Sequence, residues 1–422
     1  MKFNIYTLGC KVNTYESNVM ADHLKGAGYI EVSTEEPADI SIINTCTVTN
    51  MADSKSRKTI HHAKKSNPNS IIVVVGCMTQ NKKDDIEDAD IILGNINKSK
   101  IVDYIEEYKK NHQHLLDIQE MKNLEFESMQ LNNFNKTRAF VKIQDGCNNY
   151  CSYCVIPYTR GNVRSKKRED VLKEVQILIE KGHKEIVLTG IHTGNYGAEF
   201  EHYKFSDLLE ELVQMEGLER LRISSIEMNE INDKVLEVMK NSSVIVDHLH
   251  IPLQSGSDSV LKRMHRKYNK SEFIDKIEKI RKIRPLMSIT TDVIVGFPGE
   301  TDEEFLETID TIQKVKFSKL HVFPYSKRDQ TKAALMPNQV NGIIKKQRVS
   351  TLLELSKKLE LDYMNQFIQK EVVFLPETEK DGNIMGHTGN YLFIKMKGSK
   401  QDLNQDKKAK IVKIEYPYCI SE

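Results

Sequence analysis

The chain has 422 residues, enough for about two to four domains of ordinary size. Hydrophobic residues make up 39% and charged residues 29%, and glycine and proline are scarce, which excludes a largely disordered or fibrous protein. The formal net charge is only +1, so any affinity for nucleic acid must come from local basic patches.

Targeting signals are not evident in the sequence. The first ten residues, MKFNIYTLGC, are strand-like and lack the basic, apolar and small-residue regions of a secretory signal. The longest apolar run, residues 71–75, is far shorter than the ~20 residues that cross a bilayer. We therefore predict a soluble, cytoplasmic protein, in which the seven cysteines are ligands or nucleophiles rather than disulfides.

The first 112 residues alternate strand and helix patterns, which predicts a doubly wound parallel α/β sheet. The strands are expected at residues 4–10, 39–46 and 70–77, and the helices at 15–26 and 52–65. Each strand finishes on a cysteine: Cys10, Cys46 and Cys77. Since the carboxyl ends of parallel strands share one edge, where ligands bind, we expect the three thiols to meet there. The alternative is three unrelated buried cysteines.

Residues 113–136 are polar and are predicted to be a linker, with room for one extended strand. The alternation resumes over residues 137–368, which predicts an incomplete parallel (β/α)6 barrel with its chemistry at the strand carboxyl ends. A helix is expected over 170–182, with Asp170 as its N-cap and Gly182 as its stop. The six strands are expected to begin at Ala139, Glu185, Leu221, His248, Ser288 and Lys319.

The last segment, residues 369–422, has short strands separated by turn residues, which predicts a small antiparallel β-barrel. Its lysines make it locally basic, which favours contact with an RNA backbone, although a solvated surface has the same pattern. Cys419 lies in a strand-like stretch and is expected to be structural. The lysines are Lys395, Lys397, Lys400, Lys407, Lys408, Lys410 and Lys413.

A second cysteine set lies in the segment DGCNNYCSYCVIPYTRG, where Cys147, Cys151 and Cys154 have the spacing C-x3-C-x2-C. The same spacing describes one face of a helix, but the glycine, asparagines and proline of this segment favour a loop. Structural zinc takes four protein ligands, whereas three thiolates can hold an iron-sulfur cluster that keeps one iron open. We predict such a cluster, with zinc and a plain core as the alternatives.

This loop, with Tyr153 before its third cysteine, resembles the radical S-adenosylmethionine superfamily. The resemblance implies that the open iron of a [4Fe-4S] cluster chelates S-adenosyl-L-methionine, which is then cleaved to a radical. It also implies contacts to this cofactor from residues at the ends of later strands. These expected cofactor-binding residues are Tyr153, Thr189, Gly190, Ser225, Glu227, Gln254 and Gly296.

The whole chain resembles the methylthiotransferase family of radical S-adenosylmethionine enzymes, through TLGCKVNTYES, INTCTVT and VVGCM around the first three cysteines. The resemblance implies a second [4Fe-4S] cluster on Cys10, Cys46 and Cys77, and a carboxyl-terminal TRAM-like RNA-binding domain. The segments LTGIHTGNYG and HVFPYS look like the branch that adds a methylthio group to C2 of N6-threonylcarbamoyladenosine at position 37 of tRNA.

The partners implied are the tRNA anticodon stem-loop, an electron donor and a sulfur source, the last two unidentified. Arg160 and Arg164 follow the cysteine loop and are expected to meet the anticodon backbone, because guanidinium groups match phosphate. A solvated helix start is the alternative. The rival functions are the same reaction on a ribosomal-protein aspartate or on isopentenyladenosine in tRNA, and a non-catalytic RNA-binding protein with structural zinc.

Overall fold

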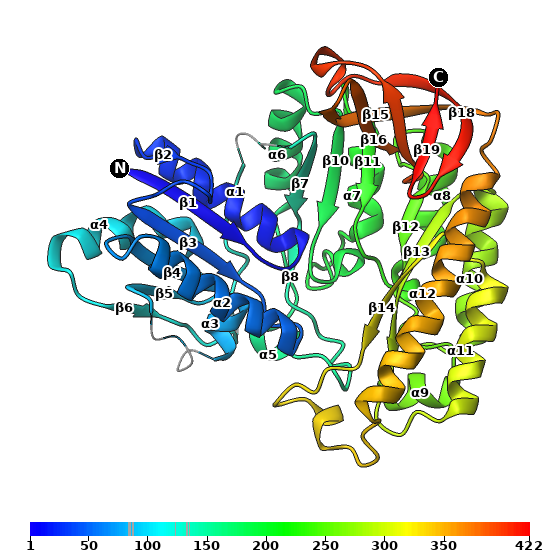
Figure 1. Ribbon diagram of the computed structural model, residues 1–422, viewed down its shortest axis with the longest axis horizontal. Coiled ribbons are helices and arrows are strands. Elements are labelled where there is room, and N and C mark those ends of the chain that lie inside the picture. The colour runs from blue at the N-terminus through cyan, green and yellow to red at the C-terminus, as the bar shows by residue number, and fades with distance from the viewer. Residues whose placement is uncertain (83–85, 87, 123, 132–133, 135) are drawn as a thin grey trace.

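Three units follow one another along the chain: a parallel sheet, an incomplete barrel of parallel strands and a small closed barrel (Figure 1). The computed structural model describes residues 1–82, 86, 88–122, 124–131, 134 and 136–422. Within these residues, no helix is both long and apolar enough to cross a membrane.

The amino-terminal unit is a six-stranded parallel sheet in the order β2-β1-β3-β4-β5-β6. Apolar residues of α1 and α4 cover one face and those of α2 cover the other, which confirms the doubly wound arrangement. The strands are β1 (Lys2–Thr7), β2 (Ile30–Glu31), β3 (Ile40–Thr45), β4 (Ile71–Gly76), β5 (Ile91–Leu93) and β6 (Leu115–Asp117). The helices are α1 (Lys11–Gly26), α2 (Asn50–Ser66), α3 (Cys77–Asn81) and α4 (Ile101–Asn111).

Strand β6 pairs with β5, so the sheet extends to Asp117, past the boundary predicted at residue 112. Residues 113–136 therefore contain the edge strand of the first sheet as well as connecting chain. Residues 123, 132, 133 and 135 of the predicted linker lie outside the described residues.

The central unit contains six parallel strands in two sheets, β11-β10-β7 and β12-β13-β14. Isolated bridges such as Ser225 to His250 join β11 to β12, which completes the predicted incomplete barrel. All six strands begin within one residue of the predicted positions. They are β7 (Arg138–Lys142), β10 (Glu185–Thr189), β11 (Arg220–Ile223), β12 (His248–His250), β13 (Ser288–Val295) and β14 (Lys319–Pro324).

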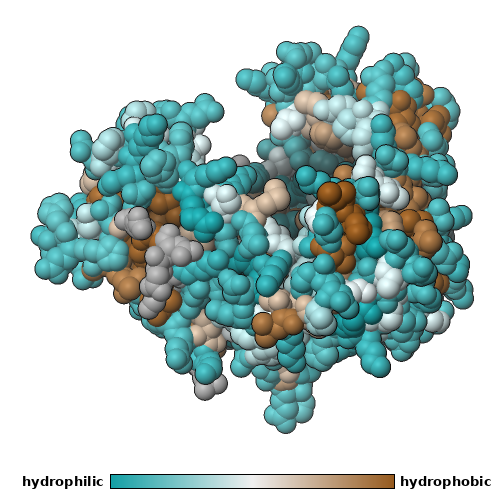
Figure 2. Space-filling view, turned by 60° about the horizontal axis from the view of Figure 1, so that its bottom comes forward, coloured by the Kyte–Doolittle hydropathy of each residue, from teal (hydrophilic) through white to brown (hydrophobic). Residues whose placement is uncertain are grey.

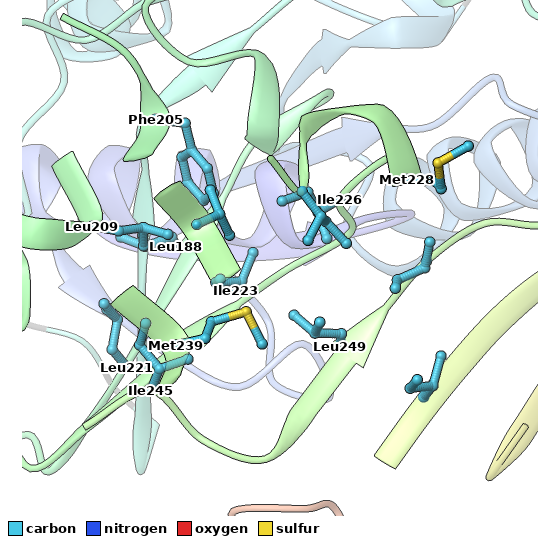
Figure 3. Close-up of a cluster of buried hydrophobic side chains, with 14 of the residues drawn as sticks. Leu188, Phe205, Leu209, Leu221, Ile223, Ile226, Met228, Met239, Ile245 and Leu249 are labelled. Carbon is cyan, nitrogen blue, oxygen red and sulfur yellow. The ribbon is translucent and has the colours of Figure 1, made fainter. Parts of the chain in front are cut away.

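Helices cover the outside of this barrel because alternate strand residues point outward as an apolar set. In Figure 3, Leu188, Leu221 and Ile223 of the strands meet Phe205 and Leu209 of α7. The helices are α6 (Arg168–Glu180), α7 (Phe205–Leu212), α8 (Asp233–Asn241), α9 (Asp258–Arg263), α10 (Lys270–Ile283), α11 (Asp302–Val315) and α12 (Gly342–Asn365).

The predicted N-cap of α6 is wrong. The helix begins at Arg168, its cap position is Lys167, and Asp170 lies in its first turn. A carboxylate in the first turn still interacts favourably with the positive end of the helix dipole, so Asp170 marks the helix start without capping it. Gly182 follows the C-cap with φ +85°, which confirms it as the stop.

The carboxyl-terminal unit is a closed five-stranded barrel, β15-β16-β17-β19-β18. It is antiparallel as predicted, except that β17 and β19 are parallel. Its core includes Phe374, Ile384 and the fully buried Cys419, which has the structural role expected of it. The strands are β15 (Glu371–Lys380), β16 (Asn383–Thr388), β17 (Phe393–Lys397), β18 (Lys407–Glu415) and β19 (Tyr418–Ser421).

Ion pairs and one tyrosine dock this small barrel on the amino ends of the central strands. Arg138 pairs with Glu377 at 3.0 Å, and Arg222 Nη1 donates to the Gly389 carbonyl at 3.1 Å. The centre of the Tyr391 ring lies 4.4 Å from the Arg222 guanidinium. The Tyr391 hydroxyl accepts a hydrogen bond from Arg138 at 2.9 Å. The barrel is therefore fixed to the central unit through partly or fully buried side chains.

Candidate functional site

The three amino-terminal cysteines lie at the carboxyl ends of neighbouring strands. Cys10 follows β1 and is the N-cap residue of α1, Cys46 follows β3, and Cys77 follows β4. Gly9 has φ +93°, and a Cβ there would lie 2.7 Å from the Cys46 Cβ, so only glycine lets the β1 loop approach Cys46 this closely. Burial raises the pKa of Cys46 to about 12, and charge on Cys77 and Cys10 acts in the same direction. The three thiols are thus within electrostatic reach of one another.

A buried group of charges surrounds this site. Arg160 Nε donates to Cys77 Sγ at 3.2 Å, and Arg160 Nη1 donates to Glu16 at 3.0 Å and to Asp145 at 3.1 Å. All of these side chains are buried. Three more cations, each paired with Glu16 or Asp145, complete the group: Lys98, Lys142 and Arg164. Four cations therefore face two carboxylates, which leaves positive charge beside Cys77.

These positions correct the prediction that Arg160 and Arg164 meet the RNA backbone. Arg160 is 0% and Arg164 5% exposed, and Arg164 Nη1 donates to the Arg160 carbonyl at 2.7 Å. A guanidinium that is buried and paired with carboxylates has no free face for phosphate. The residues instead organise the space beside Cys77.

The second cysteine set lies in a loop, as predicted. A short ladder of β8 (Gln144–Asp145) and β9 (Arg164–Ser165) closes its base, and the chain becomes helical only at α5 (Ile156–Arg160), after Cys154. Gly146 has φ +72°, and a Cβ there would lie 1.9 Å from the Asn162 carbonyl oxygen, so this crossing requires glycine. Burial raises the pKa of Cys154 to about 12, with charge on Cys151 and Cys147 adding to the shift.

Two basic side chains that the sequence did not single out as cysteine partners lie beside this loop. Arg266 Nη1 donates to Cys151 Sγ at 3.3 Å and also pairs with Glu227. His192 Nδ1 lies 3.8 Å from Cys147 Sγ. Burial alone would lower the pKa of His192, but hydrogen bonds to Cys147 and Glu230 raise it to about 10. The only sequence signal was their position after a strand or a helix of the barrel.

A pocket of about 170 Å³ opens next to Cys151. Of the predicted cofactor residues only Glu227 lines it, held there by Arg266. Figure 2, in which this end of the molecule comes forward, shows a mostly hydrophilic face with a recess between the amino-terminal lobe and the rest. The other lining residues are Asn148, Asn149, His192, Asn195, Asn229, Glu230, His265, Lys267 and Tyr268.

The remaining predicted cofactor residues lie at strand carboxyl ends or in the cysteine loop, outside this pocket. Thr189 ends β10 and Gly190 follows it, with a Cβ position 2.9 Å from Gln144 Oε1. Ser225 bridges to His250, and Tyr153 packs edge-on against Phe297. 

Two others have structural reasons for their identity or geometry. A Cβ on Gly296, which has φ +68°, would lie 2.4 Å from Cγ of Lys345, so the glycine is needed for packing against α12. Gln254 forms a parallel β-bridge with Val293, and its own backbone has a positive φ of +63°.

The amino-terminal unit is tied to the barrel beside Cys46. Arg328, in the loop after β14, is 2% exposed and pairs with Asp53 at 2.8 Å. Its Nη2 donates to the hydroxyl of Thr47, the neighbour of Cys46, at 2.7 Å.

Among the described residues, no three His, Cys, Asp or Glu side chains are gathered tightly enough to hold a single metal ion.

Two family models match the chain: the Radical SAM superfamily over residues 141–312, and the Uncharacterized protein family UPF0004 over residues 2–94. The chain is 46% identical to threonylcarbamoyladenosine tRNA methylthiotransferase MtaB of Bacillus subtilis (strain 168), over 98% of this chain and 94% of that one. The chain belongs to the radical SAM methylthiotransferase family. Members of this family use S-adenosylmethionine and [4Fe-4S] clusters.

Other members of the radical SAM methylthiotransferase family are also similar over nearly the whole chain. MtaB of Aquifex aeolicus (strain VF5) is 37% identical over 95% of this chain and 98% of its own. The tRNA-2-methylthio-N(6)-dimethylallyladenosine synthase of Thermoanaerobacter sp. (strain X514) is 38% identical, over 90% of this chain and 83% of its own.

Solved structures share the fold at low identity. The radical S-adenosylmethionine methyltransferase TsrM from Kitasatospora setae has a TM-score of 0.56 at 12% identity, covering 79% of this chain and 74% of that one. The cobalamin-dependent radical enzyme OxsB has a TM-score of 0.53 at 14% identity, and the match covers 83% of this chain and 56% of that one. These likenesses support the architecture of a parallel sheet followed by a radical SAM barrel.

Proposed function

We propose that the chain is a tRNA methylthiotransferase that replaces the C2 hydrogen of N6-threonylcarbamoyladenosine 37 with a methylthio group. The observation that carries this proposal is the contact of Arg160 with Cys77. Arg160 lies six residues after Cys154, so their Cα atoms are at most about 20 Å apart. One short segment therefore connects the two cysteine sets, as a reaction that joins a sulfur group to a radical-bearing substrate requires.

The donor sets fit two [4Fe-4S] clusters. Thiolates hold such clusters, and each set here offers three. A cluster held by three thiolates is anionic, which matches the surplus of buried cations beside Cys77 and the placement of Arg266 beside Cys151. Cys10, Cys46 and Cys77 would hold the first cluster, and Cys147, Cys151 and Cys154 the second.

When bound, the clusters and S-adenosylmethionine supply the methyl, sulfur and radical chemistry that an unactivated aromatic carbon demands. The chain's own residues bind these groups and hold the two sites in place. Arg266 holds the Glu227 carboxylate at the pocket beside Cys151, where it can accept hydrogen bonds from ribose hydroxyls. Arg328 keeps the Cys46 loop against the barrel, so that the two sites stay at a fixed separation.

We further propose four parts of the chain: a methylthiotransferase domain, a linker, a radical SAM domain over residues 137–368 and a TRAM-like domain over residues 369–422. The first boundary, predicted at residue 112, is placed after Asp117 because β6 pairs with β5, so the linker is residues 118–136. The closed barrel formed by β15 to β19 supports an RNA-binding last unit.

The substrate is testable in cells. Deletion of the gene is expected to leave threonylcarbamoyladenosine in tRNA but to remove its methylthio form, which nucleoside mass spectrometry of bulk tRNA measures. Complementation with the intact gene should restore the modified nucleoside. If the methylthio form of threonylcarbamoyladenosine is unchanged while that of dimethylallyladenosine disappears, the substrate is the one named for the Thermoanaerobacter relative. If neither changes, a protein substrate such as a ribosomal-protein aspartate becomes the better proposal.

The basic face of the small barrel supports contact with RNA. Lys408 and Lys410 are exposed on β18, on the side opposite the buried Ala409 and Ile411. Neither has a carboxylate within ion-pair distance among the residues that the structure describes, whereas Lys413 lies 2.5 Å from Glu415. The unpaired lysines are therefore the better phosphate contacts.

Replacing Lys408 and Lys410 together with Gln is expected to weaken tRNA binding and to make it less sensitive to salt. Each lost phosphate contact lowers the slope of log K against log salt concentration by about 0.7 to 0.9, so the pair should lower it by about 1.5. Fluorescence anisotropy with an anticodon stem-loop at several salt concentrations measures the slope. Lys413→Gln is the matched control on the same strand, and if this single change lowers the slope by half as much as the double change, the surface acts only through its overall charge.

A further inference from the structure

The interior of the central barrel is polar, unlike its outer face. His248 and His250 of β12 both share hydrogen bonds with Thr290 Oγ1 of β13, at 3.2 and 3.0 Å. His250 Nε2 also lies 3.3 Å from Asp292. In the adjoining sheet, Arg222 of β11 donates to Glu185 of β10 at 2.6 Å. Alternate residues of these strands, such as Leu249 and Leu221, point outward into the apolar core. A substrate group that enters the barrel therefore meets hydrogen-bonding side chains.

Lys11 crosses from the amino-terminal unit to this interior. It is the residue directly after Cys10 and the first residue of α1, and its Nζ lies 3.4 Å from Ser224 Oγ at the carboxyl end of β11. Ser224 is followed by Ser225 and Glu227 in the strand-end segment expected to contact the cofactor. The Lys11 side chain thus reaches from the residue next to Cys10 to the strand ends of the barrel.

No carboxylate pairs with Lys11 among the residues that the structure describes, because its neighbours are engaged elsewhere. Glu185 is taken by Arg222 at 2.6 Å and lies 3.9 Å from Arg220. Arg138, whose charge acts on Lys11, pairs with Glu377 at 3.0 Å. The hydroxyl of Ser224 is the hydrogen-bond partner of Lys11, and a hydroxyl does not neutralise an ammonium group. An anion that reaches this position from outside the chain would therefore meet an ammonium group that has no carboxylate partner of its own.

We propose that Lys11 binds the carboxylate of an acidic substituent on the target adenine, which under the proposed function is the threonyl carboxylate. The inference rests on that function and deepens it, because it assigns the choice between an acidic and an apolar N6 substituent to one residue. A dimethylallyl group offers no charge to Lys11 and no partner to the polar wall of His250 and Asp292. An RNA phosphate is also an anion that Lys11 could bind. Comparing RNAs that differ only in the threonyl carboxylate distinguishes the carboxylate from a phosphate.

The test compares three anticodon stem-loop RNAs, which carry threonylcarbamoyladenosine, its neutral threonine amide, or unmodified adenosine at position 37. The cluster-loaded protein should bind the acid RNA about ten- to a hundredfold more tightly than the amide RNA, as expected for a hydrogen bond between charged groups. Lys11→Met should remove most of this ratio, and Lys11→Arg should keep much of it. Lys25→Met, at the other end of the same helix, is the matched control and should keep the full ratio.

The ratio of two affinities measured on one variant does not depend on how much of that protein is folded. The iron content of the Lys11→Met protein should equal that of the unmodified protein. This comparison separates an effect on substrate binding from damage to the site at Cys10. If Lys11→Met keeps the acid preference, or weakens the acid and amide RNAs equally as a phosphate contact would, the inference is wrong while the proposed function stands. If the unmodified protein does not methylthiolate the acid RNA at all, the proposed function itself fails.

Discussion

Replacing Cys151 with Ala is expected to abolish methylthio transfer and to lower the iron content from about eight to about four atoms per chain, since each cluster contributes four. A cluster cannot be held securely by the remaining Cys147 and Cys154, and Arg266 loses the sulfur that it contacts at 3.3 Å. Formation of 5'-deoxyadenosine from S-adenosylmethionine should fall below detection with it. Iron counting and electron paramagnetic resonance after anaerobic reconstitution measure the result.

The matched control is Cys419→Ala, because Cys419 is fully buried in the core of the small barrel and far from either cysteine set in the fold. Its iron content should equal that of the unmodified protein. The corresponding change in the other set, Cys77→Ala, should also halve the iron but should leave cleavage of S-adenosylmethionine in place. Bound zinc, or about four irons in the unmodified protein, would contradict the assignment of two clusters.

Replacing Arg160 with Ala is expected to lower the free energy of unfolding by about 3 to 5 kcal/mol, because it strips buried carboxylates of their partner. Glu16 and Asp145 are both buried and both accept bonds from Arg160. Urea unfolding of the reduced protein, followed by circular dichroism, measures the change. Arg160→Lys keeps the charge but not the forked geometry, so its loss should be intermediate.

The control for Arg160 is Arg168→Ala, since Arg168 is half-exposed on the surface and pairs with Glu211 at 2.8 Å. Its unfolding curve should lie close to that of the unmodified protein. The same pair of variants tests the corrected role of Arg160. If Arg160→Ala were as stable as Arg168→Ala but bound tRNA weakly, the side chain would be an RNA contact after all.

The features that were predictable from the sequence depend on local patterns. The six barrel strands begin where alternation and apolar runs begin, and the grouping of Cys10, Cys46 and Cys77 follows from the topology of a parallel sheet. The loop around Cys147 was predictable because glycine and asparagine disfavour a helix there.

The role of Arg160 was not predictable because its partners are distant in the sequence. Glu16 lies 144 residues away, and no spacing rule connects the two. An arginine after a cofactor loop has the same local pattern whether it faces RNA or a buried carboxylate, so only the fold decides. The same holds for Gly296, whose small size serves packing against Lys345 of α12.

The docking of the small barrel has a consequence for how one nucleotide is selected. Arg138, Arg222 and Tyr391 hold that barrel to the central strands through direct contacts, so its lysine-bearing strand does not move freely on a tether. An RNA stem held there delivers to the strand ends whichever base lies at the matching distance along its backbone. Lengthening the stem by one base pair should therefore shift the modified position, or stop modification, even when the loop sequence is unchanged.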